Sequence, residues 1–206
     1  MNDLQNIVSH FSIDGTLSDI KPLGTGLIND SYQVTTIEKD KPDYVLQRIN
    51  HTIFQNVDML QENIETVTSH IRNKLEERKE EDIDRKVLKF IPAKNGKHYY
   101  FDSSNYWRIM IFIPHAKTYE TVNPEYSYYA GVAFGGFQSM LADIPVQLGE
   151  TIPNFHNMEF RLHQLHEATE VNMTGRLSEV QFYINEIEKR TDEMCKAERF
   201  YREGKL

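Results

Sequence analysis

Two glycines and an asparagine stand close together early in the chain, in the segment Gly24-Thr25-Gly26-Leu27-Ile28-Asn29. Glycines let backbone approach a ligand closely, and free N–H groups in such a loop can hold phosphate oxygens. The segment is not a Walker A loop, because no Gly-Lys-Ser/Thr follows, and Asn29 stands where G-x-G-x-x-G needs its third glycine. Taken alone, the loop favours a plain glycine turn between two strands.

A cation follows in Val45-Leu46-Gln47-Arg48, within the next β-prone run. In kinase-like folds, the strand after a glycine-loop hairpin carries a cation for the α- and β-phosphates, and a carboxylate on the following helix pairs with it. Here the cation would be Arg48, whose guanidinium can hold phosphate in a bidentate manner. The alternative is an exposed strand arginine, which is the usual state of a single Arg.

The partner carboxylate would come from the helix that follows. An apolar stripe at spacings of three and four predicts this helix and includes Val57, Leu60, Ile64, Val67, Ile71 and Leu75. Glu65 lies at the edge of the stripe, from which a side chain could reach back to the sheet, and Glu62 is the second choice. The sequence therefore predicts an ion pair between Arg48 and Glu65, with a solvated helix glutamate as the alternative.

These residues belong to a series of expected elements. After a helix within residues 1–16, β-prone runs occur at 17–23, 31–37, 44–49, 87–91, 98–101 and 107–113, with one helix between the third and fourth. Asn95-Gly96 between two of the runs predicts a β-hairpin. Beyond Pro114 the pattern gives only helices, at 126–140 and 177–201. We therefore predict an α+β fold with an antiparallel sheet and one helix in residues 1–113, followed by a helical domain in residues 114–206.

Composition narrows the function classes. The 206 residues carry a net charge of −8, which argues against sequence-independent nucleic-acid binding. The single cysteine, Cys195, cannot form an internal disulfide, and this fits a reducing compartment. The sequence shows neither a signal peptide nor an apolar run long enough to span a bilayer. We expect a cytoplasmic protein with no nucleic-acid or membrane partner.

The order of glycine loop, strand cation, helix carboxylate, further strands and then helices matches the small lobe of a protein-kinase-like fold. Its hinge would lie at Phe112-Ile113-Pro114-His115, where backbone groups hold the adenine ring in such folds. The chain resembles the N-acetylhexosamine 1-kinase branch of the aminoglycoside phosphotransferase and choline kinase-like superfamily over nearly its whole length. The similar stretches are Gly24 to Tyr32, Tyr44 to Asn50, Asn63 to Thr68, Tyr106 to Ile113 and Ala133 to Gln138.

The resemblance implies ATP and Mg²⁺ as cosubstrates and phosphorylation of a sugar hydroxyl, the anomeric one of an N-acetylhexosamine. It places the nucleotide between the Gly24–Asn29 loop and the hinge residues Phe112, Ile113 and His115. Relatives also carry Phe-His-Asp-Thr-Pro-x-Arg in a loop on the substrate side. Phe155, His156 and Arg161 match this motif, whereas Asn157 replaces its aspartate.

Kinases of this type next show a His-x-Asp catalytic loop and a later Mg²⁺-binding Asp. The chain ends at Leu206, about where that loop would begin, so the catalytic Asp and the Mg²⁺ ligands are expected beyond it. The chain is therefore interpreted as the N-terminal portion of such a kinase, inactive by itself. The alternative is a non-catalytic module that binds a nucleotide or a partner, or a truncated remnant. We also expect self-association through the C-terminal half, where helices lack cover.

Histidines give a weaker signal. His163 and His166 stand three residues apart after His156, a spacing that can bind a metal. No cysteine lies nearby, and histidines in polar segments are mostly solvated. The sequence therefore predicts no metal site.

Overall fold

The computed structural model describes residues 2–24, 26–119, 121 and 123–205. Thr25 of the glycine loop lies outside the described residues. The chain forms two compact units, Met1–Thr151 and Ile152–Leu206, and each is described by itself.

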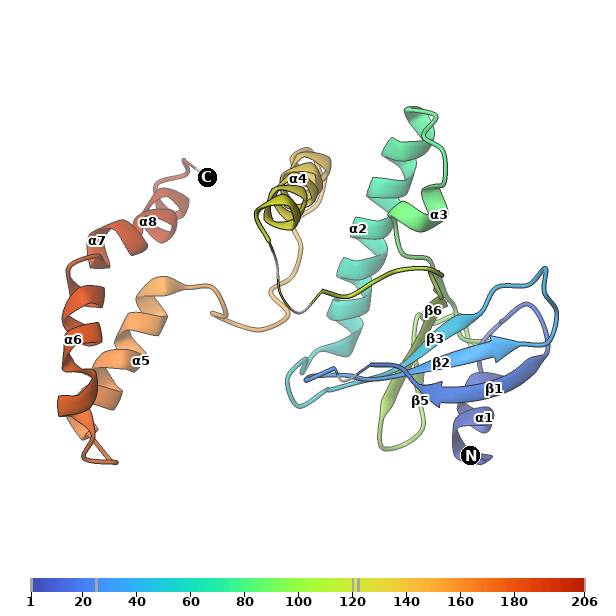
Figure 1. The fold of residues 1–206 in the computed structure, drawn as a ribbon, viewed down its shortest axis with the longest axis horizontal. Coiled ribbons are helices and arrows are strands. Elements are labelled where there is room, and N and C mark those ends of the chain that lie inside the picture. The colour runs from blue at the N-terminus through green and yellow to red at the C-terminus, as the bar shows by residue number, and fades with distance from the viewer. Residues whose placement is uncertain (1, 25, 120, 122, 206) are drawn as a thin grey trace. The chain divides into compact units, whose positions relative to one another are not determined.

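The first unit is built on a six-stranded antiparallel sheet (Figure 1). Its strands are β1 Leu17–Pro22, β2 Asp30–Thr36, β3 Tyr44–Ile49, β4 Phe90–Ile91, β5 Tyr100–Phe101 and β6 Tyr106–Ile111. The order across the sheet is β1-β2-β3-β6-β4, and β5 also pairs with β6. The sheet and the helices that accompany it confirm the predicted α+β class.

The predicted hairpin around Asn95-Gly96 is wrong. The chain does turn there, with Gly96 at a φ of +81° and its N–H bonded to the Ala93 carbonyl at 2.8 Å. However, β4 pairs with Met110 and Ile109 of β6, and β5 pairs with the other end of β6. The two short strands therefore share one edge of β6 instead of pairing with each other. The connecting segment instead forms an isolated bridge from Ala93 to Phe11.

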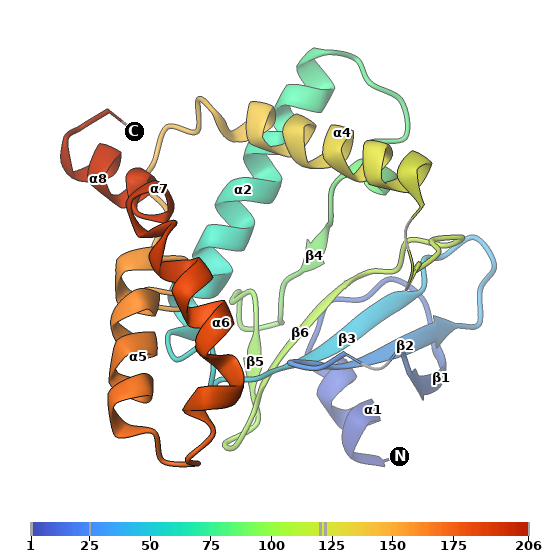
Figure 2. The same ribbon diagram turned by 60° about the vertical axis from the view of Figure 1, so that its left-hand side comes forward.

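One face of the sheet packs against α1, Asn2–Ser9. Because side chains alternate along a strand, Tyr44 and Leu46 of β3 point to the same face, and both are fully buried there. They join Val34, Ile109 and α1 residues in the larger hydrophobic core. Figure 2 shows α1 on this side of the sheet and α2 on the other.

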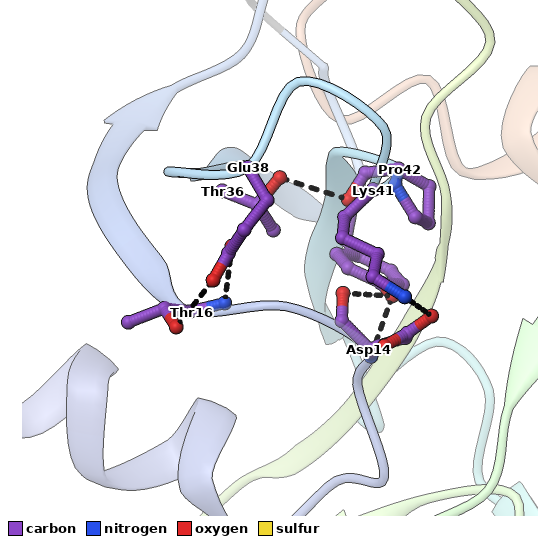
Figure 3. A network of polar contacts seen from close by, with 7 residues as sticks. Asp14, Thr16, Thr36, Glu38, Lys41 and Pro42 are labelled. Atoms are coloured by element: carbon purple, nitrogen blue, oxygen red, sulfur yellow. Dashed lines mark hydrogen bonds and ion pairs between the residues drawn. The ribbon is translucent and has the colours of Figure 1, made fainter.

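A polar network fastens the segment after α1 to the turn between β2 and β3 (Figure 3). Glu38 accepts hydrogen bonds from the Thr16 N–H at 2.8 Å and from the Thr16 hydroxyl at 2.7 Å. Lys41 Nζ donates to Asp14 at 2.9 Å. The buried Tyr44 hydroxyl accepts from the Asp14 N–H and donates to its carbonyl, at 2.8 and 3.0 Å. These contacts join the segment that follows α1 to the β2–β3 turn and to the start of β3.

The opposite face carries α2, Val57–Glu77, followed by the short α3, Ile83–Lys86. Asn56 caps α2 by accepting from the Met59 N–H at 3.0 Å. The predicted stripe is confirmed in part, because Val57, Leu60 and Leu75 are buried. A second, smaller core forms where Val57 and Leu60 meet Ile49 and Tyr99.

Helix α4, Pro124–Leu141, belongs to the first unit because it is fastened to α2. Lys74 Nζ donates to the Met140 carbonyl at 2.8 Å and also pairs with Asp143. The side chain of Asn63 forms two hydrogen bonds with the backbone of Gly149, at 2.7 and 2.9 Å. The boundary between the compact units thus lies between residues 151 and 152. The predicted boundary between residues 113 and 114 separates the two lobes of a kinase-like fold, and it stays a prediction.

No residue described in α4 is buried. The side chain of Phe134 is 71% exposed, and Tyr128 and Val132 are exposed as well. Phe137 is about half exposed although it lines a cavity under α2. An apolar helix face of this kind fits the predicted self-association, which stays a prediction.

The second unit is helical. Its helices are α5 Met158–Val171, α6 Leu177–Glu188, α7 Thr191–Met194 and α8 Lys196–Arg202. Polar contacts join its helices: His166 Nε2 lies 2.6 Å from Glu188, and Arg202 donates to Glu159 at 2.5 and 2.7 Å. The prediction of a single helix over 177–201 is wrong, because the helix is interrupted after Glu188 and again at Cys195.

Among the described residues, no helix is both long and apolar enough to cross a bilayer.

Candidate functional site

The glycine loop is a tight connection between β1 and β2. Gly24 has a φ of +71°, a conformation that favours glycine. A Cβ on Gly26 would lie 2.9 Å from the Asn29 carbonyl oxygen, so this position leaves no room for a side chain. The Asn29 side chain accepts from the Asn50 N–H at 2.9 Å and thereby ties the loop to the end of β3. The backbone conformation therefore favours glycine at position 24, and the nearby carbonyl oxygen of Asn29 favours it at position 26.

Arg48 lies at the same end of the sheet as the loop. Antiparallel pairing sets Asp30 directly opposite Arg48, and Arg48 Nε donates to the Asp30 carboxylate at 2.7 Å. Both side chains are about half exposed. Together with Ile28, Asn50 and neighbouring residues they line a cavity of about 460 Å³ with mostly polar walls. The structure thus brings together the loop and the predicted strand cation.

The predicted ion pair between Arg48 and Glu65 is wrong. Arg48 shares the face of Tyr44 and Leu46, by alternation along β3, and this face packs against α1. Glu65 lies on α2, which packs against the opposite face. It accepts a hydrogen bond from the Ser69 hydroxyl at 3.2 Å and lies 3.6 Å from the ring of His98. The second choice, Glu62, is exposed.

The hinge residues Phe112, Ile113 and His115 follow β6 at the other end of the strands. The Phe112 N–H donates to the Asp43 carbonyl at 2.9 Å, and His115 has a φ of +61°. Arg85 donates to the Pro114 carbonyl at 2.8 Å. Phe112 and Ile113 line a cavity of about 710 Å³ together with the turn between β2 and β3. Loop and hinge line separate cavities in this structure.

A polar row on the α2 face was not anticipated from the sequence. Ser31 of β2 is paired with Gln47 of β3, and Gln47 is paired with Arg108 of β6. Gln47 Nε2 donates to the Ser31 hydroxyl at 3.0 Å. Its Oε1 accepts from Arg108 Nε at 2.9 Å and from Nη2 at 2.6 Å. The three residues, called here the Ser31–Gln47–Arg108 row, form one hydrogen-bonded chain across three strands.

Arg108 is the charged end of the row. Burial lowers the pKa of its guanidinium to about 10. The ring of Phe90 lies 5.5 Å from the guanidinium carbon. Nη1 is buried and has no hydrogen-bond partner among the described residues. The side chain lines a cavity of about 600 Å³ between the sheet, α2 and α4. In the sequence, Arg108 could be noticed only as a charge inside the run Trp107 to Ile113, which is otherwise apolar.

The substrate-side candidates lie in the second unit and contact one another. Arg161 donates from Nε and Nη2 to the Phe155 carbonyl, at 3.2 and 3.1 Å. Its guanidinium also lies over the rings of Phe155 and Phe160, each at 5.7 Å. His156 meets the Phe155 ring edge-on. Asn157, which replaces the expected aspartate, caps α5 by accepting from the Phe160 N–H at 2.8 Å. These contacts account for the local conformation, and a role in substrate binding stays a prediction.

The two histidines whose spacing could have bound a metal each have an acidic partner. His163 lies 3.3 Å from Glu167, and His166 lies 2.6 Å from Glu188. Within the part of the chain that the structure describes, no group of three or more His, Cys, Asp or Glu residues could hold a metal ion. The carboxylate nearest the glycine loop, Asp30, is occupied by Arg48.

No family model matches the chain. Among solved structures, the chain is similar to the crystal structure of spectinomycin phosphotransferase APH(9)-Ia in complex with ADP and spectinomycin, with 13% sequence identity and a TM-score of 0.46. The match covers 93% of this chain and 57% of that chain.

Proposed function

We propose that this chain is the nucleotide-binding part of an ATP-dependent phosphotransferase that acts on small molecules. One observation carries the proposal: the glycine loop and the hinge segment lie at opposite ends of the same three strands. The loop adjoins the paired residues Asp30 and Arg48, whereas the hinge is bonded to Asp43, just before β3. Five residue steps along β3 separate these ends by about 17 Å.

The surface between the two ends suits a nucleotide. The side chains of Ser31, Gln33, Val45 and Gln47 are half-buried and mostly polar, and alternation places them on the α2 face. A nucleoside triphosphate lying along β2 and β3 would put its base at Phe112 to His115 and its phosphates near Gly24 and Gly26. Backbone N–H groups of a glycine loop and an arginine are the groups that bind phosphate in proteins.

The acceptor follows from the sequence resemblance, which points to an N-acetylhexosamine. Phe155, His156 and Arg161 are the residues that we assign to the sugar side. Mg²⁺ would neutralise charge on the nucleotide in such a reaction. We assign no residue of this chain to the metal and derive no step of phosphoryl transfer through it.

Calorimetric titration with a non-hydrolysable ATP analogue tests the nucleotide site. We expect binding to the wild-type chain and at least a tenfold loss in Gly26→Val, because a side chain there would collide with the Asn29 carbonyl. Gly131→Ala is the matched control, since its Cβ would meet no atom within 4 Å. Equal affinity in Gly26→Val and the wild type would remove the loop from the site. An absence of binding to the wild type would overturn the proposed function.

Acceptor choice is tested separately. In the presence of the ATP analogue, saturation-transfer NMR should detect N-acetylglucosamine or N-acetylgalactosamine in preference to glucose. A chain that binds nucleotide but none of these sugars would contradict the assignment of the acceptor and leave the nucleotide site intact.

A further inference from the structure

The cavity beneath α2 contains a partly covered cation, Arg108, whose Nη1 is buried and which has no acidic neighbour in the cavity wall. Its walls are largely apolar and include Leu60, Ile64, Val67, Met110 and Phe137. None of the described residues that line it is an aspartate or a glutamate. Lys86 also lines it, but its ammonium pairs with Glu80 at 2.8 Å. The cavity therefore has a positive charge at Arg108 and no carboxylate to balance it.

Three other polar side chains of the cavity, those of Asn63, Thr68 and Gln47, are already bonded. The amide of Asn63 is held on both sides by the backbone of Gly149, and the Thr68 hydroxyl donates to the Ile64 carbonyl at 2.8 Å. Gln47 uses its Oε1 for Arg108 and its Nε2 for Ser31. Arg108 Nη1, by contrast, is buried and unpartnered among the described residues.

An unpaired buried charge is costly, and proteins normally compensate it with an opposite charge. Burial has already moved the pKa of Arg108 down to about 10, yet the group stays charged at neutral pH. An anion that accepts a hydrogen bond from Nη1 would supply both the missing partner and the missing charge. The surrounding apolar walls would strengthen this interaction, because they exclude water.

The position of the row indicates which anion fits. Ser31 stands two residues after Asn29, so the row starts at the glycine loop and ends at Arg108. Two strand spacings separate its ends, about 10 Å. A phosphate chain is a flexible polyanion that can extend over this distance, whereas a single carboxylate cannot reach both ends of the row.

We propose that Arg108 binds the phosphate chain of the nucleotide, with Gln47 as the positioning residue that orients its guanidinium. This inference rests on the proposed function and changes its chemistry, because the phosphate-binding cation then comes from β6. Arg48, the cation expected from the sequence, points to the α1 face and pairs with Asp30.

Calorimetry with ADP and adenosine tests the assignment, since the difference between the two affinities reports phosphate binding. We expect Arg108→Met to lose about tenfold or more in affinity for ADP and to keep its affinity for adenosine. Arg176→Met, an exposed arginine in the second unit, is the matched control and should behave as the wild type. An Arg108→Met protein that binds ADP as tightly as the wild type would overturn the assignment. So would a loss confined to Arg48→Met.

NMR of the arginine side chains in the wild-type chain guards against a variant that fails to fold. Inorganic pyrophosphate should shift the Nε–H signal of Arg108 in a saturable manner, and no shift at millimolar pyrophosphate would overturn the proposal. This measurement also separates the two proposals. A chain that binds neither ADP nor adenosine contradicts the proposed function, while the pyrophosphate titration still decides whether Arg108 is an anion site.

Discussion

The two faces of the sheet in the first unit differ although they alternate residue by residue along the same strands. On the α1 face, Leu46 and Ile109 are completely buried among other apolar side chains. On the α2 face, their sequence neighbours Gln47 and Arg108 form a polar row that is only partly covered. Apolar burial is the main source of folding free energy, whereas unpaired buried polar groups reduce it. The α1 face therefore stabilises the sheet, and the α2 face keeps polar groups at a cost in stability.

The largest expected effect breaks the α1 face. Leu46→Ala removes a side chain of 0% exposure from the larger core, and we expect a loss of about 3 kcal/mol in the free energy of unfolding. Urea unfolding followed by circular dichroism measures it. Val45→Ala, one residue away on the half-buried opposite face, is the matched control and should lose about 1 kcal/mol or less. Similar losses in the two variants would contradict the difference between the faces.

The α1 face is also the part that the sequence predicted best. Strand β3 has the bounds that the run Tyr44 to Ile49 indicated, because β-prone residues such as Tyr44, Val45 and Ile49 dominate it and the turn at Pro42-Asp43 precedes it. The hairpin at Asn95-Gly96 failed for a different reason. A turn signal fixes where the chain reverses, but the partner of each flanking strand was β6, which is set by packing that no local pattern encodes.

A second prediction concerns Arg108 in the absence of a ligand. Arg108→Met should stabilise the chain by about 1 kcal/mol at neutral pH, because the removal of a charge without an acidic partner outweighs the loss of its two hydrogen bonds to Gln47. Since burial lowers the pKa of Arg108 to about 10, folding disfavours the charged form. The cost is thus fully present below pH 10 and is relieved as the pH rises above it. Thermal unfolding at pH 7 and pH 9 should show the same gain at both.

Arg48→Met is the control for this prediction, because the half-exposed Arg48 should contribute little. If Arg108→Met were less stable than the wild type by more than about 1 kcal/mol, the guanidinium would stabilise the packing of the α2 face. The Ser31–Gln47–Arg108 row would then not lower the free energy of unfolding.

The site was harder to predict than the fold. Alternation along β3 could have shown that Arg48 shares the face of Tyr44 and Leu46, and hence that it could not meet a helix on the other side. Arg108 could not be connected with Gln47 in this way. Their pairing depends on the register between strands that are 61 residues apart, and only the folded sheet fixes that register.

A third, smaller effect concerns Gln61 on α2. Its side chain is 3% exposed, and neither of its amide atoms has a partner among the described residues. Gln61→Leu should therefore stabilise the chain by about 1 kcal/mol, as burial of an unpaired amide is replaced by apolar contact. Gln55→Leu, which is exposed just before the helix, should change the free energy of unfolding very little. Destabilisation by Gln61→Leu would mean that the amide has a partner in solution, such as a bound water.

The smallest expected effect concerns the attachment of α4 to α2. The hydrogen bond from Lys74 lowers the pKa of Asp143, burial opposes this, and His70 at 3.2 Å adds to the lowering. A lowered carboxyl pKa stabilises the folded chain above the ordinary value of 3.8, and this contribution is lost as the pH falls below it. Because Asp143 is exposed, the effect on global stability should be slight, and local hydrogen exchange is the better measurement. We expect the protection factors of α4 amides to fall below about pH 4 in the wild type, and to be equally low at every pH in Asp143→Asn. Lys74→Met should behave like Asp143→Asn, since it removes the other half of the pair. If instead neither variant changes exchange in α4, the contacts of Asn63 with Gly149 are sufficient to hold the helix over the α2 face.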